Sequence, residues 1–318
     1  MKQKEIKPIK MIELINKDFP PIDWVINELI PEESIVYISG YPGCGKSWTM
    51  LEMAIKISQG GLVLNHFQAN KAKVLFVDEE NGIRILQRRL KLLTRKKDLD
   101  IEFISYGNIK FIDSDRLTKY CLENEIKVVF MDSFVRFHSG DENNSNEMSK
   151  IYESIKEFKR NGLTLIIAHH TRKSENKNSD PIKDLRGSSE IVAAIDCGLA
   201  IKKTNKNELT FYQTKLRIDE ERSPFTVELV REEDSTRLEY INDIEVQERQ
   251  SKVAIAKMKI MTLLGNKKEE FRKSIIDALS DDCKLSSIKQ ALKELEQKGS
   301  IQKEGFGAGN TVLYKINN

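Results

Sequence analysis

The sequence of 318 residues lacks the features that mark secreted, metal-bound or membrane proteins. It has four cysteines, with no C-x-x-C pair and no histidine at metal-ligand spacing, which argues against a disulfide framework and a zinc site. No apolar run approaches the ~18 residues of a membrane span, and the first ten residues lack the apolar core of a signal peptide. We therefore expect a soluble, cytoplasmic protein with no membrane contact.

An excess of charge of one sign is also missing, since 52 Lys and Arg stand against 49 Asp and Glu, for a net charge of +3. The chain has no overall basic character that would attract a polyanion, so any contact with nucleic acid must come from local patches. At roughly 100 to 200 residues per domain, the length predicts two domains.

A glycine-rich turn between a predicted strand and a predicted helix is the most specific signal present. Residues 34–50, SIVYISGYPGCGKSWTM, contain the pattern G-x-x-x-x-G-K-[ST]. The glycines let backbone N–H groups surround a phosphate, and the following helix presents its positive end to it. Lys46 would reach the β- and γ-phosphates of ATP, and Ser47 would bind Mg²⁺. We assign nucleotide binding to Gly40, Pro42, Gly43, Cys44, Gly45, Lys46, Ser47 and Trp48.

From residue 34 to about 202, short apolar runs alternate with helix-compatible stretches. The predicted strands are SIVYIS, KVLFVDEE, IEFISYG, KVVFMDS, LTLIIAHH and CGLAIKK, and the predicted helices lie near 47–58, 82–93, 114–125 and 145–161. This alternation predicts an α/β fold with a mainly parallel sheet and flanking helices. Three further runs between 207 and 240 predict antiparallel strands.

The two ends of the chain differ from this pattern. Residues 1–20 are rich in lysine and predict a flexible arm, and a charged stretch near 245 to 252 predicts a linker. Helices are predicted at 252–264 and 268–280, followed by a third helix and two short strands around a glycine-rich turn. This order is the outline of a winged helix. The predicted domains are 1–20, an ATPase domain at 21–243 and a winged helix at 250–318.

Two of the predicted strands end in carboxylates. A magnesium ion and an attacking water both require carboxylates at the carboxyl edge of such a sheet. KVVFMDS ends in Asp132, which we expect to hold Mg²⁺ together with Ser47. KVLFVDEEN ends in Asp78, Glu79 and Glu80, and a carboxylate at this position can orient or deprotonate the water.

With these motifs, residues 20 to 240 resemble the RecA-like P-loop ATPases, and more narrowly the RepA-type hexameric replicative helicases. The resemblance implies that Glu80 is the catalytic glutamate, with Glu79 as the alternative. It also implies a polar sensor of the γ-phosphate at the end of the strand that follows the Asp132 strand, where LTLIIAHHTRKS carries two histidines. We favour His170 for this role over His169.

Two polar stretches, 138–148 and 172–187, follow the strands that carry these groups. In RecA-like families, loops at these positions line a central channel and contact single-stranded DNA; a solvated surface loop is the alternative. The second stretch supplies positive charges for phosphate contacts, namely Arg172, Lys173, Lys177 and Lys183.

A basic pair, Lys215 and Arg217, lies on one of the later predicted strands, where alternation places both side chains on one face. In the hexameric helicases that the chain resembles, such a pair reaches across the subunit interface to the γ-phosphate of the neighbour. The simpler alternative is an edge strand that carries solubilising charges. The acidic turn at 219–222 could also pair with these cations.

The resemblance implies an ATPase with ATP and Mg²⁺ as cofactors that acts as a helicase or translocase on single-stranded DNA. It implies a homo-oligomer, a hexameric ring, serving replication of a plasmid, phage or other mobile element. Two alternatives stay open: a RecA/RadA- or KaiC-like regulatory ATPase, and an ATP-controlled DNA-binding initiator or regulator without unwinding activity. The winged helix would bind duplex DNA or a protein.

Overall fold

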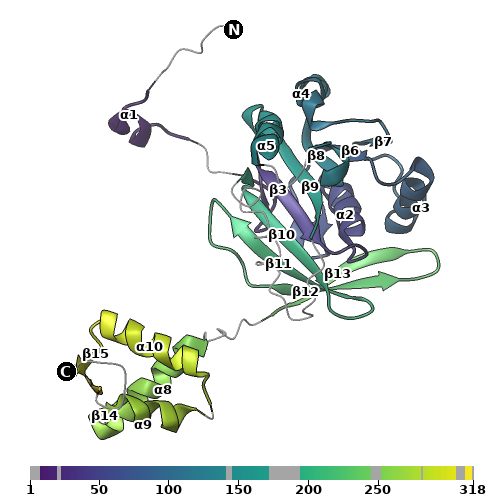
Figure 1. Cartoon of the computed structure of the whole chain (residues 1–318). Helices are drawn as coiled ribbons and strands as arrows, with labels where there is room; N and C mark the ends of the chain where they lie inside the picture. The colour runs from purple at the N-terminus through teal and green to yellow at the C-terminus, as the bar shows by residue number, and fades with distance from the viewer. Residues whose placement is uncertain are drawn as a thin grey trace. The chain divides into compact units, whose positions relative to one another are not determined.

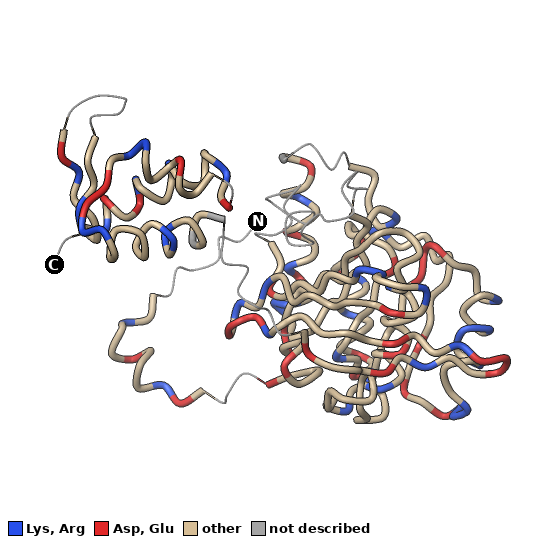
Figure 2. Tube along the Cα trace, turned by 90° about the horizontal axis from the view of Figure 1, so that it is seen from below, with Lys and Arg blue, Asp and Glu red and all other residues tan. Residues whose placement is uncertain are grey.

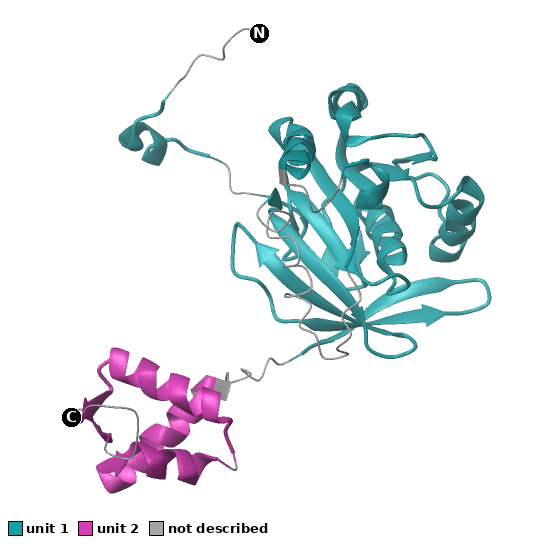
Figure 3. Ribbon diagram, in the orientation of Figure 1, with its two compact units in different colours: residues 1–244 teal, residues 245–318 magenta. Residues whose placement is uncertain are grey.

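The computed structural model describes residues 8–19, 23–140, 145–171, 194–244, 252–280, 282–305 and 312–316. The chain divides into two compact units, residues 1–244 and 245–318 (Figures 1 and 3). Several predictions fall outside the described residues. They concern the four basic residues of the second polar stretch, part of the first polar stretch, most of the linker and the glycine-rich turn near the C-terminus.

A nine-stranded sheet forms the centre of the first unit, in the order β13-β12-β11-β10-β3-β9-β8-β6-β7. The six strands from β10 to β7 are parallel, and β11, β12 and β13 extend the sheet in antiparallel fashion. The predicted α/β class with a mostly parallel sheet is therefore confirmed. The strands are β3 (Ile35–Gly40), β6 (Lys73–Asp78), β7 (Ile101–Ser105), β8 (Ile126–Asp132), β9 (Thr164–His170), β10 (Cys197–Lys203), β11 (Glu208–Leu216), β12 (Phe225–Arg231) and β13 (Thr236–Asp243).

Helices cover both faces of this sheet (Figure 1). Successive strand residues point to opposite faces, so in β8 Phe130 joins the core under α2 while Met131 joins the core under α4 and α5. This explains why the central strands are apolar on both faces. The helices are α2 (Lys46–Gln59) and α3 (Ile83–Leu93) on one side, and α4 (Ser114–Glu123) and α5 (Ser145–Arg160) on the other.

The sequence pattern did not predict several short elements, because segments of two to five residues show too little periodicity. The short elements are α1 (Met11–Ile15), β1 (Trp24–Ile26), β2 (Ile30–Pro31), β4 (Leu62–Val63), β5 (Phe67–Gln68) and the 3-10 helices η1 (Phe111–Asp113) and η2 (Phe134–Arg136).

None of the described helices combines the length and apolarity needed to cross a membrane.

The second unit combines three helices with a small antiparallel sheet of order β14-β16-β15 around its own core. The predicted helix at 268–280 is wrong at its start, because residues 269–271 form β14. Pairing of this segment with β16 overrides its local helical pattern. The elements are α8 (Lys252–Lys267), β14 (Glu269–Phe271), α9 (Arg272–Leu279), α10 (Leu285–Gln297), β15 (Ile301–Glu304) and β16 (Leu313–Ile316).

Glu52 is a fully buried carboxyl group in the middle of α2. Its Oε1 accepts a hydrogen bond from the backbone N–H of Leu64 at 3.1 Å, while Oε2 has no hydrogen-bond partner in the part of the chain that the structure describes. Burial raises the pKa of Glu52 from 4.5 to about 8. The side chain is therefore protonated in the folded protein at neutral pH.

Glu52 should make the folded protein less stable as the pH rises. The folded state binds this proton more tightly than the unfolded state, so the stabilisation is complete below pH 4.5 and is lost as the pH approaches 8. Between pH 4.5 and 7 we expect the free energy of unfolding to fall by about 3 kcal/mol relative to Glu52→Gln, which cannot titrate. Urea denaturation of both proteins across this range measures the difference. If the free energy of unfolding changed with pH in the same way in both proteins, the raised pKa of Glu52 would be contradicted.

Candidate nucleotide site

The loop between β3 and α2 requires its glycines. Gly43 and Gly45 have φ angles of 79° and 100°, in the left-handed region that other residues rarely adopt. At Gly40 a Cβ atom would lie 2.5 Å from the carbonyl oxygen of Ile201 and 2.6 Å from Sγ of Cys44. The loop therefore packs closely against the end of β10, and any side chain at Gly40 would push the loop away from β10.

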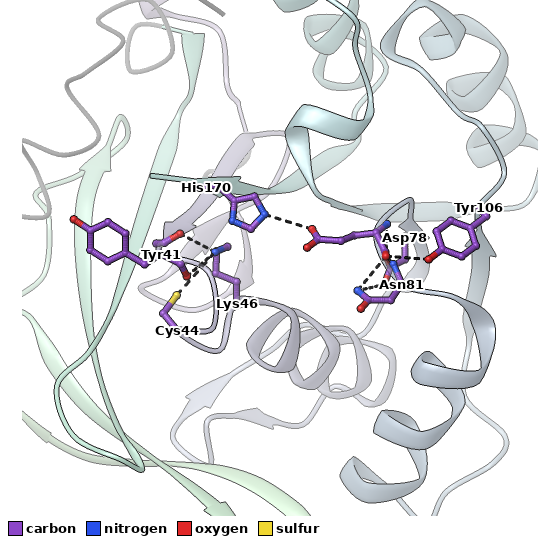
Figure 4. A network of polar contacts seen from close by, with 9 residues as sticks. Tyr41, Cys44, Lys46, Asp78, Asn81, Tyr106 and His170 are labelled. Atoms are coloured by element: carbon purple, nitrogen blue, oxygen red, sulfur yellow. Dashed lines mark hydrogen bonds and ion pairs between the residues drawn. The ribbon is translucent and has the colours of Figure 1, made fainter. Parts of the chain in front are cut away.

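Lys46 is buried at the first position of α2 and points into this loop (Figure 4). Its Nζ donates hydrogen bonds to the carbonyl oxygens of Gly40 at 2.7 Å and Tyr41 at 3.1 Å, and lies 4.0 Å from Sγ of Cys44. Burial lowers the pKa of Lys46. The ammonium group thus lies where a phosphate held by the loop would be, with weak acceptors that a phosphate oxygen can replace.

The other predicted loop residues differ in their surroundings. Pro42 and Gly43 are exposed, whereas Cys44 is buried, and burial raises the pKa of its thiol. The half-buried ring of Trp48 packs against the core under α2, and the guanidinium groups of Arg89 and Arg231 lie 5.6 and 5.8 Å from its centroid. Its side chain therefore contacts α3 and β12.

Asp132 ends β8 and is buried beside the start of α2. Burial raises its pKa to about 6, although a hydrogen bond with Ser47 opposes this increase. Its Oδ2 is buried and has no hydrogen-bond partner among the described residues. A hydroxyl and a carboxylate that meet next to a phosphate-binding loop fit Mg²⁺, which takes one or two carboxylates plus phosphate oxygens and waters. No cluster of three or more His, Cys, Asp or Glu suited to a metal occurs in the described ranges.

Sheet register brings the ends of β6, β8 and β9 together. Asp78 lies directly opposite Asp132, and His170 lies opposite Gly40. Alternation along each strand places Asp78, Asp132 and His170 on the face covered by α2. The carboxylate of Asp78 accepts hydrogen bonds from the backbone N–H groups of Glu80 at 2.9 Å and Asn81 at 2.6 Å, so it shapes the turn after β6.

The two glutamates after β6 point to different neighbours. Oε1 of Glu79 accepts a hydrogen bond from the backbone N–H of Ile109 at 3.0 Å, which ties it to the loop after β7. Oε2 of Glu80 lies 3.4 Å from Nε2 of His170 (Figure 4). Burial acts to raise the pKa of Glu80, but the nearby side chains of Ser133 and His170 and the charge of Lys46 hold it below the usual value. Glu80 is therefore ionised and faces the loop.

The two histidines at the end of β9 lie on opposite faces of the sheet. The ring of His169 stacks on Tyr37, with centroids 5.6 Å apart, and lies 5.5 Å from the ring of Phe134. Burial lowers the pKa of His169 to about 4, so it is neutral at physiological pH. The structure thus brings His170, and not His169, to the side of Glu80 and Lys46.

Lys215 and Arg217 lie at the opposite end of the sheet from the loop. Nε of Arg217 is 3.3 Å from Oδ1 of Asp196, whose Oδ2 accepts a hydrogen bond from the backbone N–H of Ile35 at 3.0 Å. Lys215 pairs in register with Gly198 near the start of β10. Because Ile35 begins β3 and the loop follows its end, about 17 Å of strand separates the basic pair from the loop of the same chain.

Arg222, the last residue of the acidic turn after Arg217, has acidic partners outside the turn. Arg222 forms ion pairs with Glu28 at 3.0 Å and Asp243 at 2.6 Å, and its guanidinium group lies over the rings of Phe67 and Phe225. Arg217 forms an ion pair with Asp196. Arg222 thus joins the turn to the antiparallel part of the sheet.

A model of the family described as an AAA domain matches residues 2–176. The chain belongs to this AAA domain family. Its match includes the phosphate-binding loop, Glu80, Asp132 and His170, so these residues lie in a P-loop ATPase domain. Membership indicates ATP hydrolysis, with ATP as the nucleotide and Mg²⁺ as its usual metal. No curated protein matches the chain.

Three residues of this AAA domain protein were not predicted from the sequence to contact functional groups, namely Asp196, Lys159 and Ser133. Ser133 follows Asp132, and its hydroxyl group helps to hold the pKa of Glu80 below the usual value. Nothing in the local sequence distinguishes Asp196, because its contact with Ile35 spans 161 residues and its contact with Arg217 depends on the pairing of β10 with β11. A buried carboxylate of this kind has no sequence signature.

Proposed function

We propose that the protein is an ATP-driven translocase or helicase on single-stranded DNA that acts as a homo-oligomer, a hexameric ring, in replication of a plasmid, phage or other mobile element. The observation that carries this proposal is the distance between Arg217 and the P-loop of the same chain. Arg217 lies at the start of β3 and the loop at its end. At this distance the guanidinium group cannot reach a γ-phosphate in its own loop, and we propose that it acts on the γ-phosphate of a neighbouring subunit as an arginine finger.

The described residues support specific roles in hydrolysis. Lys46 leaves the carbonyl oxygens of the loop and binds the β- and γ-phosphates. Ser47 and Asp132 would hold Mg²⁺, which neutralises charge on the same phosphates. Glu80 orients the attacking water and accepts its proton. His170 contacts Glu80 and precedes the second polar stretch, and we propose that it reports loss of the γ-phosphate to that stretch.

The second unit is proposed to be a winged helix that binds duplex DNA. Its order of elements, α8-β14-α9-α10-β15-β16, matches that outline. On α10, Lys289 and Lys293 are exposed one turn apart, and Lys298 and Lys303 are exposed beyond it. Acidic residues also occur in this unit (Figure 2), so the number of phosphate contacts is small.

Residues 250–318, expressed alone, should bind duplex DNA with an affinity that falls as salt rises. Neutralising phosphates releases counterions, and each contact contributes a log-log slope of about −0.9. Titration at two salt concentrations measures the slope, and Lys289→Ala with Lys293→Ala should reduce it by about 2. Failure to bind at low salt would assign this unit to a protein partner.

Strand separation on a forked DNA substrate tests the overall proposal. We expect unwinding with ATP, and none with Lys46→Ala, because that variant loses the cation of the loop. Nucleotide-dependent duplex binding without unwinding would instead support an initiator or regulator. ATP hydrolysis that single-stranded DNA does not change would support a regulatory ATPase.

A further inference from the structure

One buried carboxylate outside the nucleotide site contacts three parts of the first unit. Oδ2 of Asp196 accepts the N–H of Ile35 at the start of β3, at 3.0 Å. Oδ1 lies 2.8 Å from Nζ of Lys159 on α5 and 3.3 Å from Nε of Arg217. The side chain of Asp196 is 5% exposed, against 41% for Lys159 and 53% for Arg217. A buried anion therefore holds two half-exposed cations.

The backbone of Asp196 is anchored independently of its side chain. Its N–H donates to the carbonyl oxygen of Ile35 at 2.9 Å, and its own carbonyl oxygen accepts the N–H of Arg217 at 2.9 Å. The carboxylate thus has a defined position between the start of β3 and the end of β11. The long side chains of Lys159 and Arg217 can change their distances to this carboxylate.

Lys159 connects this carboxylate to α5. It lies in the last turn of a helix of 16 residues, which is about 24 Å long. The helix begins at Ser145, within the polar stretch 138–148, for which the family resemblance implies contact with single-stranded DNA. Because a helix moves as a rigid element, displacement of its first turn shifts Lys159 as well.

We propose that Asp196 is the positioning residue for Arg217 and that it links α5, through Lys159, to the placement of that guanidinium group. Lys159 and Arg217 contact the same oxygen of Asp196, Oδ1. Displacement of Lys159 therefore changes the ion pair between Asp196 and Arg217. A cavity of about 630 Å³ lined in part by Lys159, Asp196 and Arg217 leaves room for such a shift. The inference rests on the proposed function, because it takes Arg217 to serve the neighbour's phosphate.

Asp196→Asn in the full chain tests the positioning role. Asparagine keeps an oxygen for the N–H of Ile35 but offers no negative charge to the two cations. We expect kcat to fall roughly 10- to 100-fold, since misplacement of a catalytic group by about 1 Å has an effect of this size. The KM for ATP and the melting temperature should stay close to wild type. In an Arg217→Ala background the same substitution should cause no further loss.

The outcomes separate a positioning role from a merely structural one. An equal fold-loss in both backgrounds, or wild-type turnover in Asp196→Asn, would overturn the proposal. If Arg217→Ala itself had wild-type turnover, the finger assignment would fail, and the link with it.

The link to α5 has its own pair of variants. Lys159→Met should lower severalfold the ratio of kcat in the presence of oligo(dT) to kcat in its absence, because it removes the connection between α5 and Asp196. Lys156→Met is the matched control, because Lys156 lies one turn earlier on the same helix and pairs with Glu153 at 2.6 Å. Equal ratios in the two variants would overturn the link through Lys159.

Discussion

Glu80→Gln should bind ATP and almost stop hydrolysing it. The substitution keeps the size of a side chain that lies 3.4 Å from His170 but removes the carboxylate that accepts a proton from water. Loss of a general base lowers turnover by about 10² to 10⁴-fold. The measurement is steady-state ATPase activity together with equilibrium binding of ATP, and the variant should accumulate as an ATP-bound oligomer.

Glu79→Gln is the matched control, because Glu79 is the adjacent carboxylate and accepts the N–H of Ile109. An amide oxygen can accept the same hydrogen bond, so activity should stay near wild type. Wild-type turnover in Glu80→Gln with loss in Glu79→Gln would assign the base to Glu79. Lys46→Ala should differ from both, since it also weakens ATP binding.

Mixing Lys46→Ala with Arg217→Ala subunits should restore ATPase activity that each variant lacks alone. An arginine finger contributes about 10³ to 10⁵-fold to turnover. In a mixed ring, some interfaces join an intact P-loop in one subunit to an intact Arg217 in the next. Activity measured across mixing ratios should therefore pass through a maximum, and wild-type turnover should rise steeply with protein concentration.

Arg237→Ala is the control for loss of an arginine from the antiparallel part of the sheet. Arg237 pairs with Glu232 at 2.8 Å and Glu239 at 2.7 Å on the surface, so its loss should leave turnover unchanged. A monomer with undiminished turnover at nanomolar concentration would exclude a role for Arg217 between subunits. Replacing Lys215 should weaken the same step.

The sequence by itself determined the features that depend on neighbouring residues. The phosphate-binding loop follows from glycine spacing, and the parallel sheet follows from apolar runs of strand length between helical patterns. Asp132 was predicted because it ends such a strand, whereas the choice of Glu80 among the carboxylates that follow β6 came from the family resemblance. The short hairpins were missed because strands of two or three residues show too little periodicity, and β14 was missed because it forms by pairing with the distant β16.

Only the tertiary structure decided how these residues face one another. Glu79 and Glu80 are adjacent carboxylates in the sequence, as His169 and His170 are adjacent histidines. Strand direction and helix packing then send one member of each pair towards the loop. The position of Arg217 at the far end of β3, beside Asp196, likewise depends on the pairing of β3 with β10 and β11. Contacts between residues far apart in the chain leave no local pattern, because they are determined by packing of the whole sheet.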